Sequence, residues 1–208
     1  MLLNLHVLNI IKRRLCFLKL ENKNIGFAFT GSFCTFKSTI AELKKISKIC
    51  NIIPIMSFNS YSLDTKFGKA IDFIKEIEEI TGNKIIHTIQ DAEPIGPKNM
   101  LDILIIAPCT GNTIAKLAYD IIDTPVLMAA KSHLRNNKPL VIAPSTNNGL
   151  SGSGKNIGDL LNRKNYYFVP FKQDNPITKP RSIVFDPSYI LKTLEFALDN
   201  EQIQPIML

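Results

Sequence analysis

The chain has 208 residues, of which 45% are hydrophobic and 21% are charged, a composition typical of one globular domain with a full core. No apolar run approaches the roughly 20 residues of a membrane-spanning helix, which excludes that class of protein. The net charge is +7, but +4 of it lies in the first 24 residues and the rest is dispersed among mixed-sign segments, which argues against nucleic-acid binding.

Residues 1–24 differ in character from the rest of the chain. A mildly apolar stretch precedes a basic cluster, which is the reverse of the order in a secretory signal. We expect an N-terminal extension of low order here, followed by a single domain over residues 25–208. A short amphipathic surface helix, a membrane-surface contact and an over-long translation start are the alternatives for this extension.

The four cysteines show neither CxxC spacing nor the spacing of zinc ligands, and they are Cys16, Cys34, Cys50 and Cys109. We therefore expect free thiols, no metal site and a reducing compartment, which indicates the cytoplasm.

Strand and helix patterns alternate along the chain. Helical spacing is clearest where Ile71, Ile74 and Ile77 recur every three residues before Gly82. In chain order the sequence predicts a strand at 24–29, a helix at 36–48, a strand at 52–57, a polar loop at 58–64, a helix at 67–80, a short strand at 84–89, a strand at 103–107 with a helix directly after it, a helix at 125–134, a strand at 139–143, a helix from 156, a strand at 166–169, a loop at 170–187 and a helix at 188–198.

This alternation predicts an α/β fold. The strands are apolar runs of the kind that are buried on both faces, so helices should cover both sides of a parallel sheet. The expected architecture is a Rossmann-like, three-layer, doubly wound parallel sheet in a single domain.

Small polar residues follow three of the predicted strands. Because the carboxyl ends of parallel strands meet at one edge of the sheet, these residues should converge on a mononucleotide-type ligand. Their hydroxyl and amide groups, and the free N–H groups of the following helix, can address phosphate oxygens. The pattern is neither GxGxxG nor a Walker lysine loop. The predicted cofactor-binding residues are Thr30, Gly31, Ser32, Ser57, Pro108, Cys109, Thr110, Gly111, Asn112 and Thr113.

Four residues are candidates for chemistry or substrate binding. Cys109 is a candidate nucleophile and His87 a candidate acid or base, with a structural histidine as the alternative for His87. Lys131 and Arg181 are candidate contacts for a phosphate or a substrate, with a solvated charge as the alternative for each.

The loops at 30–32 and 107–113 resemble the flavoprotein family that includes phosphopantothenoylcysteine decarboxylase, lantibiotic cysteine decarboxylases and flavin prenyltransferases. The resemblance implies an FMN cofactor, with its phosphate at the first loop and its flavin and ribityl chain at the second. Within this family the chain is similar to the B subunits of dipicolinate synthases. That likeness covers residue 25 to the C-terminus, in segments 30–36 (TGSFCTF), 64–70 (DTKFGKA), 92–97 (AEPIGP), 107–113 (APCTGNT), 129–137 (AAKSHLRNN) and 155–158 (KNIG).

The resemblance to that branch implies a role in spore formation, in the mother-cell cytoplasm. The expected reaction is an oxidoreductase-type synthesis of pyridine-2,6-dicarboxylate from a dihydrodipicolinate-type precursor of the lysine pathway. The expected partners are the NAD(P)-binding A subunit of the synthase, a small dicarboxylate substrate and further copies of this chain. An FMN-dependent decarboxylase or prenyltransferase acting alone, and a non-catalytic partner module, are the alternatives. Residues 143–147 (APSTN) replace the Met-bearing substrate motif of the decarboxylases, which argues against cysteine decarboxylation.

Overall fold

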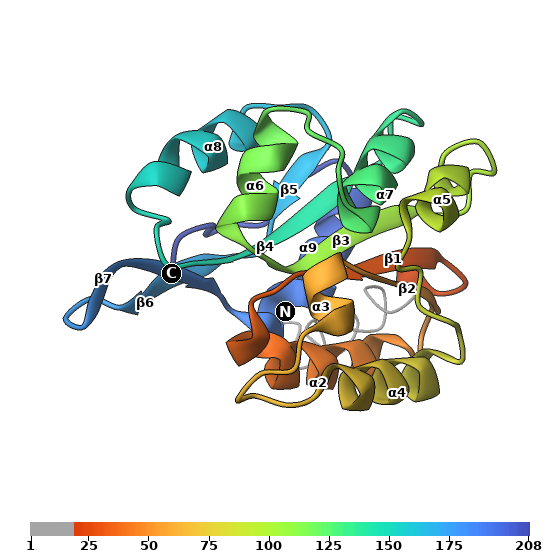
Figure 1. Ribbon diagram of the computed structural model, residues 1–208. Helices are drawn as coiled ribbons and strands as arrows, with labels where there is room; N and C mark the ends of the chain where they lie inside the picture. The colour runs from red at the N-terminus through yellow and green to blue at the C-terminus, as the bar shows by residue number, and fades with distance from the viewer. Residues whose placement is uncertain (1–18) are drawn as a thin grey trace, which may run out of the picture.

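A computed structural model describes residues 19–208 of the chain (Figure 1). Seven strands form one sheet in the order β2-β1-β3-β4-β7-β6, with β5 paired to the first half of β4. The strands are β1 (Asn24–Phe29), β2 (Asn51–Met56), β3 (Ile103–Cys109), β4 (Leu140–Thr146), β5 (Tyr166–Phe168), β6 (Phe171–Asn175) and β7 (Lys179–Phe185).

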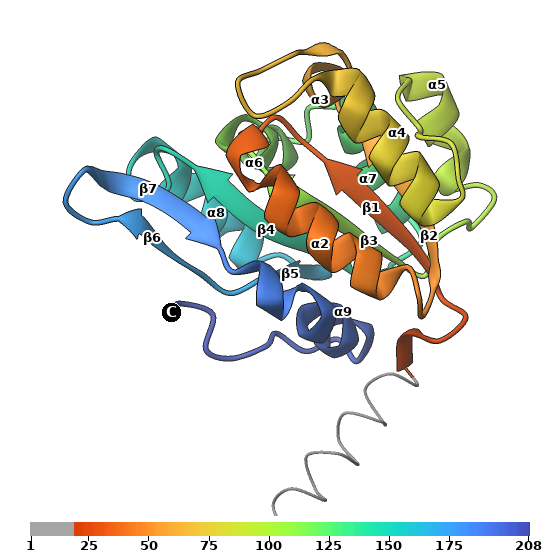
Figure 2. The ribbon, with the colours of Figure 1, turned by 90° about the horizontal axis from the view of Figure 1, so that it is seen from below.

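Helices cover both faces of the sheet, which confirms the expected three-layer α/β architecture. Helices α2, α4 and α9 lie on one face, and α6, α7 and α8 lie on the other (Figures 1 and 2). The helices are α2 (Phe36–Ile46), α3 (Phe58–Ser62), α4 (Ala70–Thr81), α5 (Ile89–Ala92), α6 (Gly111–Ala118), α7 (Pro125–Leu134), α8 (Gly152–Leu161) and α9 (Ile190–Leu198), and the short 3-10 turns are η1 (Phe33–Thr35), η2 (Glu93–Ile95) and η3 (Pro187–Tyr189).

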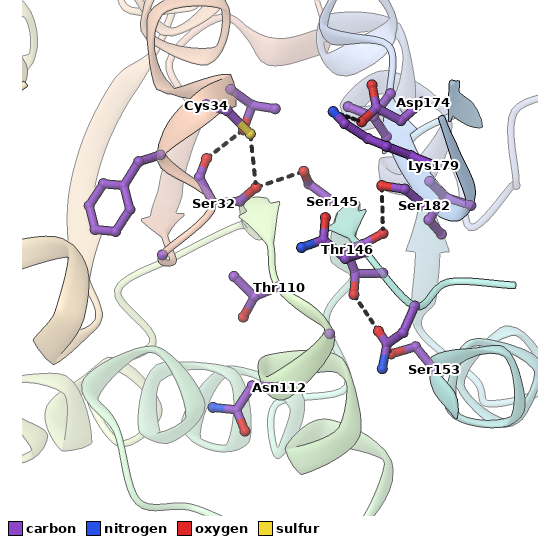
Figure 3. A pocket seen from close by; sticks show the side chains of 18 of the residues that line it. Ser32, Cys34, Thr110, Asn112, Ser145, Thr146, Ser153, Asp174, Lys179 and Ser182 are labelled. Atoms are coloured by element: carbon purple, nitrogen blue, oxygen red, sulfur yellow. Dashed lines mark hydrogen bonds and ion pairs between the residues drawn. The ribbon is translucent and has the colours of Figure 1, made fainter. Parts of the chain in front are cut away.

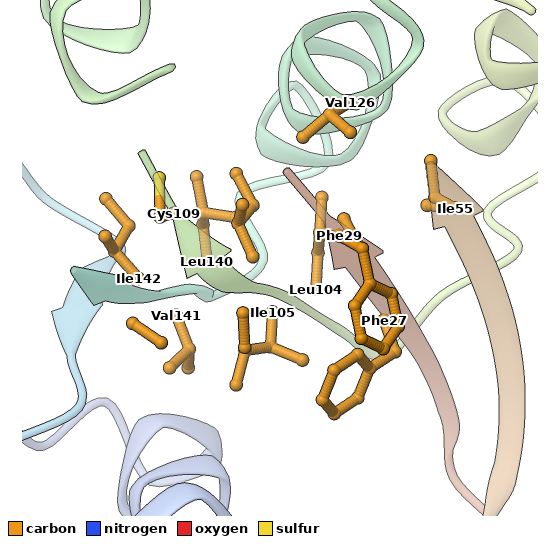
Figure 4. Packing of buried hydrophobic residues seen from close by; sticks show 14 of the residues in the cluster. Phe27, Phe29, Ile55, Leu104, Ile105, Cys109, Val126, Leu140, Val141 and Ile142 are labelled. Atoms are coloured by element: carbon orange, nitrogen blue, oxygen red, sulfur yellow. The ribbon is translucent and has the colours of Figure 1, made fainter. Parts of the chain in front are cut away.

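Strand β3 forms the centre of the core, and every one of its residues is buried. Leu104 points toward α7, and Ile105, the next residue, points to the opposite face (Figure 4). A central strand between two helical layers has no solvent-facing side, so its sequence is a continuous apolar run rather than an alternating one.

Strands β2, β1, β3, β4 and β5 pair in parallel. The chain leaves β1 toward one edge of the sheet and β3 toward the other, so β1 and β3 flank the point where the winding direction changes. In open α/β sheets the crevice at the carboxyl ends of these two strands is where ligands bind.

The predicted elements are wrong for residues 170–187, 84–89 and 58–64. Residues 170–187, predicted as a loop, form the antiparallel β6–β7 hairpin. Strand β7 also pairs antiparallel with the end of β4, where Ser145 and Thr146 lie opposite Val184 and Ile183. The sheet is therefore mixed and not wholly parallel. Phe171 is the one buried residue of β6, and a single buried apolar position does not give the sequence pattern of a strand. Residues 84–89, predicted as a strand, contribute an isolated bridge between Ile55 and Ile86.

The loop predicted at 58–64 contains the short helix α3. The Ser57 hydroxyl accepts a hydrogen bond from the Ser60 N–H and caps the first turn. The helix predicted at 67–80 is α4, which ends at Gly82 with a positive φ of 67°.

Residues 1–18 of the predicted N-terminal extension (residues 1–24) lie outside the described residues. Of its last six residues, Leu20 is fully buried and Asn24 begins β1. No helix within residues 19–208 has both the length and the apolar character to cross a bilayer.

His133 in α7 makes the stability of the fold dependent on pH. Its ring is 1% exposed, and its Nε2 donates to the Pro139 carbonyl at 2.9 Å. Burial lowers the pKa of His133 from 6.5 to about 4. A histidine with a depressed pKa stabilises the fold fully above the pKa of the unfolded chain, and this contribution is lost as the pH falls from 6.5 toward 4.

We therefore expect the stability advantage of the wild type over His133→Gln to shrink by about 3 kcal/mol between pH 7 and pH 4. Glutamine keeps a donor for Pro139 but cannot titrate. Urea unfolding of both proteins at several pH values checks this, and parallel pH profiles would contradict it.

Candidate functional site

A hydrogen-bonded tie joins the carboxyl ends of β1 and β3. The Thr30 hydroxyl donates to the Pro108 carbonyl at 2.8 Å and accepts from the Thr110 N–H at 3.0 Å. Thr30 is 1% exposed, and its hydroxyl fixes the two loops against each other. The carboxyl ends of β1 and β3 therefore lie side by side, as the sequence predicts.

A cavity of about 1120 Å³ opens beside this tie (Figure 3). The loops after β1, β3 and β4 form its floor, and the start of α8, the β6–β7 hairpin and the loop between α3 and α4 complete its walls. We call it the main cavity. Its lining residues at the carboxyl ends of these three strands include Gly31, Ser32, Cys34, Thr110, Gly111, Asn112, Ser145, Thr146, Asn147 and Asn148.

A polar cluster behind Gly111 shapes the cavity floor. The Asn148 Oδ1 accepts from the Thr146 hydroxyl at 2.6 Å and from the Ser153 hydroxyl at 2.7 Å. A Cβ atom on Gly111 would lie 2.8 Å from the Ser153 Oγ and 2.9 Å from the Asn148 Oδ1, closer than real Cβ contacts allow. Glycine is thus required where α6 begins, because this polar cluster packs directly against its backbone.

A second hollow of about 370 Å³ lies on the other side of Gly31, toward α3 and α7. Its lining includes Thr30, Ser57, Thr113 and Lys116. The Lys116 Nζ lies 2.6 Å from an Asp123 carboxylate oxygen. Both hollows share Gly31, Thr110 and Asn112. Eight of the ten predicted cofactor-binding residues line one or both hollows, and Pro108 and Cys109 line neither.

The helix α6 presents its N-terminus at the junction of the two hollows. Thr110 caps it, because its hydroxyl accepts from the Thr113 N–H at 3.3 Å. The N–H groups of Gly111 and Asn112 have no intrahelical acceptor, and the helix dipole places partial positive charge there. This corner of the site favours an anion.

Cys109 lies outside both hollows. Its side chain is fully buried, and burial raises the pKa of its thiol. The thiolate is the nucleophilic form, so a thiol held neutral in the core is unsuited to that role. Cys34, which was not among the predicted site residues, is exposed and lines the main cavity with its Sγ 3.8 Å from the Ser32 Oγ.

The structure separates the other three candidates from the main cavity. His87 stacks on Tyr61 with ring centroids 3.9 Å apart, in a surface hollow that the helix α4 also lines. Lys131 lines a further hollow between α5 and α7, together with Arg135. Arg181 is exposed on β7 and lines none of these hollows.

Several residues of the main cavity were missed by the sequence prediction. Ser145, near the end of β4, and Asn147, directly after β4, come after an apolar run, as the residues after β3 do. Ser145 shares a hydrogen bond of 2.7 Å with Ser32. That repeated pattern could have identified them. Lys66, Phe67 and Lys179 lie on elements whose position over the cavity depends on tertiary packing.

Among the described residues, no group of three or more His, Cys, Asp or Glu side chains could hold a metal ion. Of the residues lining the main cavity, which all belong to the described part of the chain, Lys66, Lys179 and Asp174 carry charge. The cavity surface is otherwise made of neutral polar and apolar groups.

Comparisons of sequence and of structure with known proteins agree on one family. Residues 18–178 match the Flavoprotein family. The chain is 43% identical over 189 residues to the B subunit of dipicolinate synthase from Bacillus subtilis (strain 168), covering 90% of this chain and 94% of that protein.

Two solved structures illustrate the fold. The crystal structure of the B subunit of dipicolinate synthase from Bacillus halodurans has a TM-score of 0.84 and 40% identity, covering 91% of this chain and 97% of that one. The FMN-dependent cysteine decarboxylase SpaF has a TM-score of 0.63 and 19% identity, covering 87% and 97%. The chain therefore belongs to the Flavoprotein family.

Proposed function

We propose that the chain is the B subunit of a dipicolinate synthase, which works together with the A subunit to make dipicolinate from a dihydrodipicolinate-type precursor. The observation that carries this proposal is the 43% identity along 94% of the Bacillus subtilis protein. Identity of this level over nearly the whole length supports transfer of the role, whereas the 19% identity to SpaF supports the fold alone.

The proposed cofactor is FMN, and the lining of the two hollows fits it. Gly31, Ser32 and Ser57 offer backbone and hydroxyl donors to the phosphate, and the N-terminus of α6 adds a partial positive charge. Gly111 lets the Thr146–Asn148–Ser153 cluster, which supplies polar groups to the cavity floor, pack against the start of α6. Thr110 and Asn112, which line both hollows, would contact the flavin and its ribityl chain.

The size of the main cavity suits more than one ligand. Its volume of 1120 Å³ exceeds the range of about 300–1,000 Å³ typical of small-molecule sites, so a substrate has room beside a cofactor. Bound flavin supplies an acceptor for two electrons, the number removed when a dihydropyridine ring becomes aromatic. The protein's part is to hold the planar substrate within the walls of the cavity and away from bulk water.

The proposal also covers the assembly. We propose that the A subunit carries NAD(P), that this chain forms a homo-oligomer, and that the complex works in the cytoplasm of the mother cell during sporulation. The Bacillus subtilis relative is itself one subunit of a synthase, which supports the existence of a partner for this chain.

Reconstitution tests the proposed function. Purified full-length chain is mixed with the purified A subunit, FMN, a nicotinamide cofactor and the precursor, and dipicolinate is followed by its absorbance. We expect synthesis to require both proteins, and flavin to copurify with this chain. Full activity of the A subunit without this chain would overturn the proposal, and turnover of a separate substrate by this chain alone would favour a decarboxylase or prenyltransferase instead.

A further inference from the structure

The distribution of charge in the main cavity is the starting point. Within the described residues, its lining holds two cationic side chains, Lys66 and Lys179, and one carboxylate, Asp174. The two lysines come from different elements, the loop between α3 and α4 and the β6–β7 hairpin. Figure 2 shows both elements on the side to which the arrowheads of β1 and β4 point.

A tight turn over residues 65–68 presents Lys66. Its backbone is closed by hydrogen bonds from the Thr65 N–H to the Gly68 carbonyl at 3.0 Å and from the Gly68 N–H to the Thr65 carbonyl at 3.1 Å. Gly68 has a φ of +152°, and a Cβ there would lie 2.7 Å from the Phe73 ring. The turn is therefore fixed against α4, and its tip, Lys66 and Phe67, is held at the cavity.

The tip of this turn combines a cation with an exposed aromatic ring. Phe67 is 42% exposed although it is a large apolar residue, and the Lys66 Nζ lies 5.3 Å from its ring centroid. An exposed aromatic side chain at a cavity wall is suited to cover the flat face of a planar ligand. The ammonium group beside it is suited to a carboxylate at the edge of that ligand.

The β6–β7 hairpin presents Lys179 and holds it in an ion pair. The Lys179 Nζ lies 2.6 Å from an Asp174 carboxylate oxygen, and both side chains are part of the cavity lining (Figure 3). The hairpin is anchored to β4, because the Ser182 hydroxyl donates to the Thr146 carbonyl at 3.3 Å. Asp174 thus occupies the position at Lys179 that the carboxylate of a ligand would take.

We propose that Lys66 and Lys179 each bind one carboxylate of a planar dicarboxylate, and that Phe67 covers its ring. This inference rests on the proposed function and specifies how the same cavity recognises its substrate and product. A dianion needs two compensating charges, and these two lysines supply them. Asp174 competes with the ligand for Lys179, so its charge opposes binding.

The test compares two probes on the FMN-loaded, full-length chain by calorimetry. Dipicolinate carries two carboxylates and picolinate, pyridine-2-carboxylate, carries one. We expect Lys66→Gln and Lys179→Gln each to weaken dipicolinate binding by about tenfold, since a hydrogen bond to a charged group is lost at a partly exposed site. The preference for dipicolinate over picolinate should fall toward 1 in both variants.

Two further variants sharpen the test. Asp174→Asn should tighten dipicolinate binding several-fold, because Lys179 loses its competing carboxylate. Lys69→Gln is the matched control, since Lys69 is an exposed lysine three residues beyond Lys66 that does not line the cavity. It should leave both affinities unchanged. In the reconstituted synthase, the two lysine variants should raise KM far more than they lower kcat, and FMN affinity should not change.

The outcomes separate this inference from the proposed function. Unchanged dipicolinate affinity in both lysine variants would overturn the inference, and so would undetectable binding of dipicolinate to the wild-type chain, alone or in the reconstituted synthase. Synthesis that still depends on this chain would leave the proposed function standing in either case.

Discussion

Gly31→Val is expected to weaken FMN binding by about 10- to 100-fold while the protein stays folded. A Cβ on Gly31 would lie 3.6 Å from the Phe33 ring and 3.8 Å from the Asn59 Cβ, which are ordinary contacts, so the backbone need not move. Phe33 lines the main cavity and Asn59 the second hollow, so the two valine methyl groups would enter the space between them. Overfilling a packed site costs about 1–3 kcal/mol or more in binding free energy.

Flavin fluorescence quenching measures this affinity, and circular dichroism checks the fold. Gly158→Val is the matched control, because Gly158 is exposed in α8 and a Cβ added there would have nothing within 4 Å. It should bind FMN as the wild type does. A folded Gly31→Val protein with wild-type FMN affinity would remove the β1 loop from the cofactor site.

Thr30→Val is expected to lower the free energy of unfolding by about 2 kcal/mol. Valine has nearly the shape of threonine but no hydroxyl, so the Thr110 N–H loses its acceptor. The Pro108 carbonyl keeps one partner, the backbone N–H of Thr30 at 3.2 Å. The loss therefore falls on a part-buried N–H group at the start of α6, and FMN affinity should fall with it.

Thr30→Ser is the control for this prediction, because serine retains the hydroxyl that makes both hydrogen bonds. Urea unfolding should rank the wild type first, Thr30→Ser second and Thr30→Val last. A Thr30→Val protein more stable than Thr30→Ser would mean that the methyl group, rather than the hydroxyl, contributes most at this position.

The parallel part of the fold could be predicted because buried strands carry an unmistakable sequence pattern. The apolar run of β3 has no polar side, so it must lie between two helical layers. Once β1 and β3 are parallel neighbours, their carboxyl ends meet by geometry. The approach of Thr30 to Thr110 therefore followed from the strand pattern without any contact information.

The outer walls of the main cavity could not be predicted in the same way. The β6–β7 hairpin has little apolar content in β6, and its place depends on pairing with the end of β4. An exposed lysine such as Lys66 has the same local sequence character whether it faces a cavity or open solvent. For the same reason Lys131 and Arg181 could be nominated as substrate contacts from sequence although neither lines the main cavity.

The attachment of the β6–β7 hairpin has an evolutionary consequence. Its backbone pairs with the parallel strands at only two positions, at the end of β4, and its tip, where Ile177 is 89% exposed, is free of the core. Insertions or substitutions in the tip would therefore alter the depth and chemistry of one wall while leaving folding of the buried strands intact. Related proteins with this fold can therefore come to prefer different ligands through changes in the tip of the β6–β7 hairpin, at little cost in thermodynamic stability.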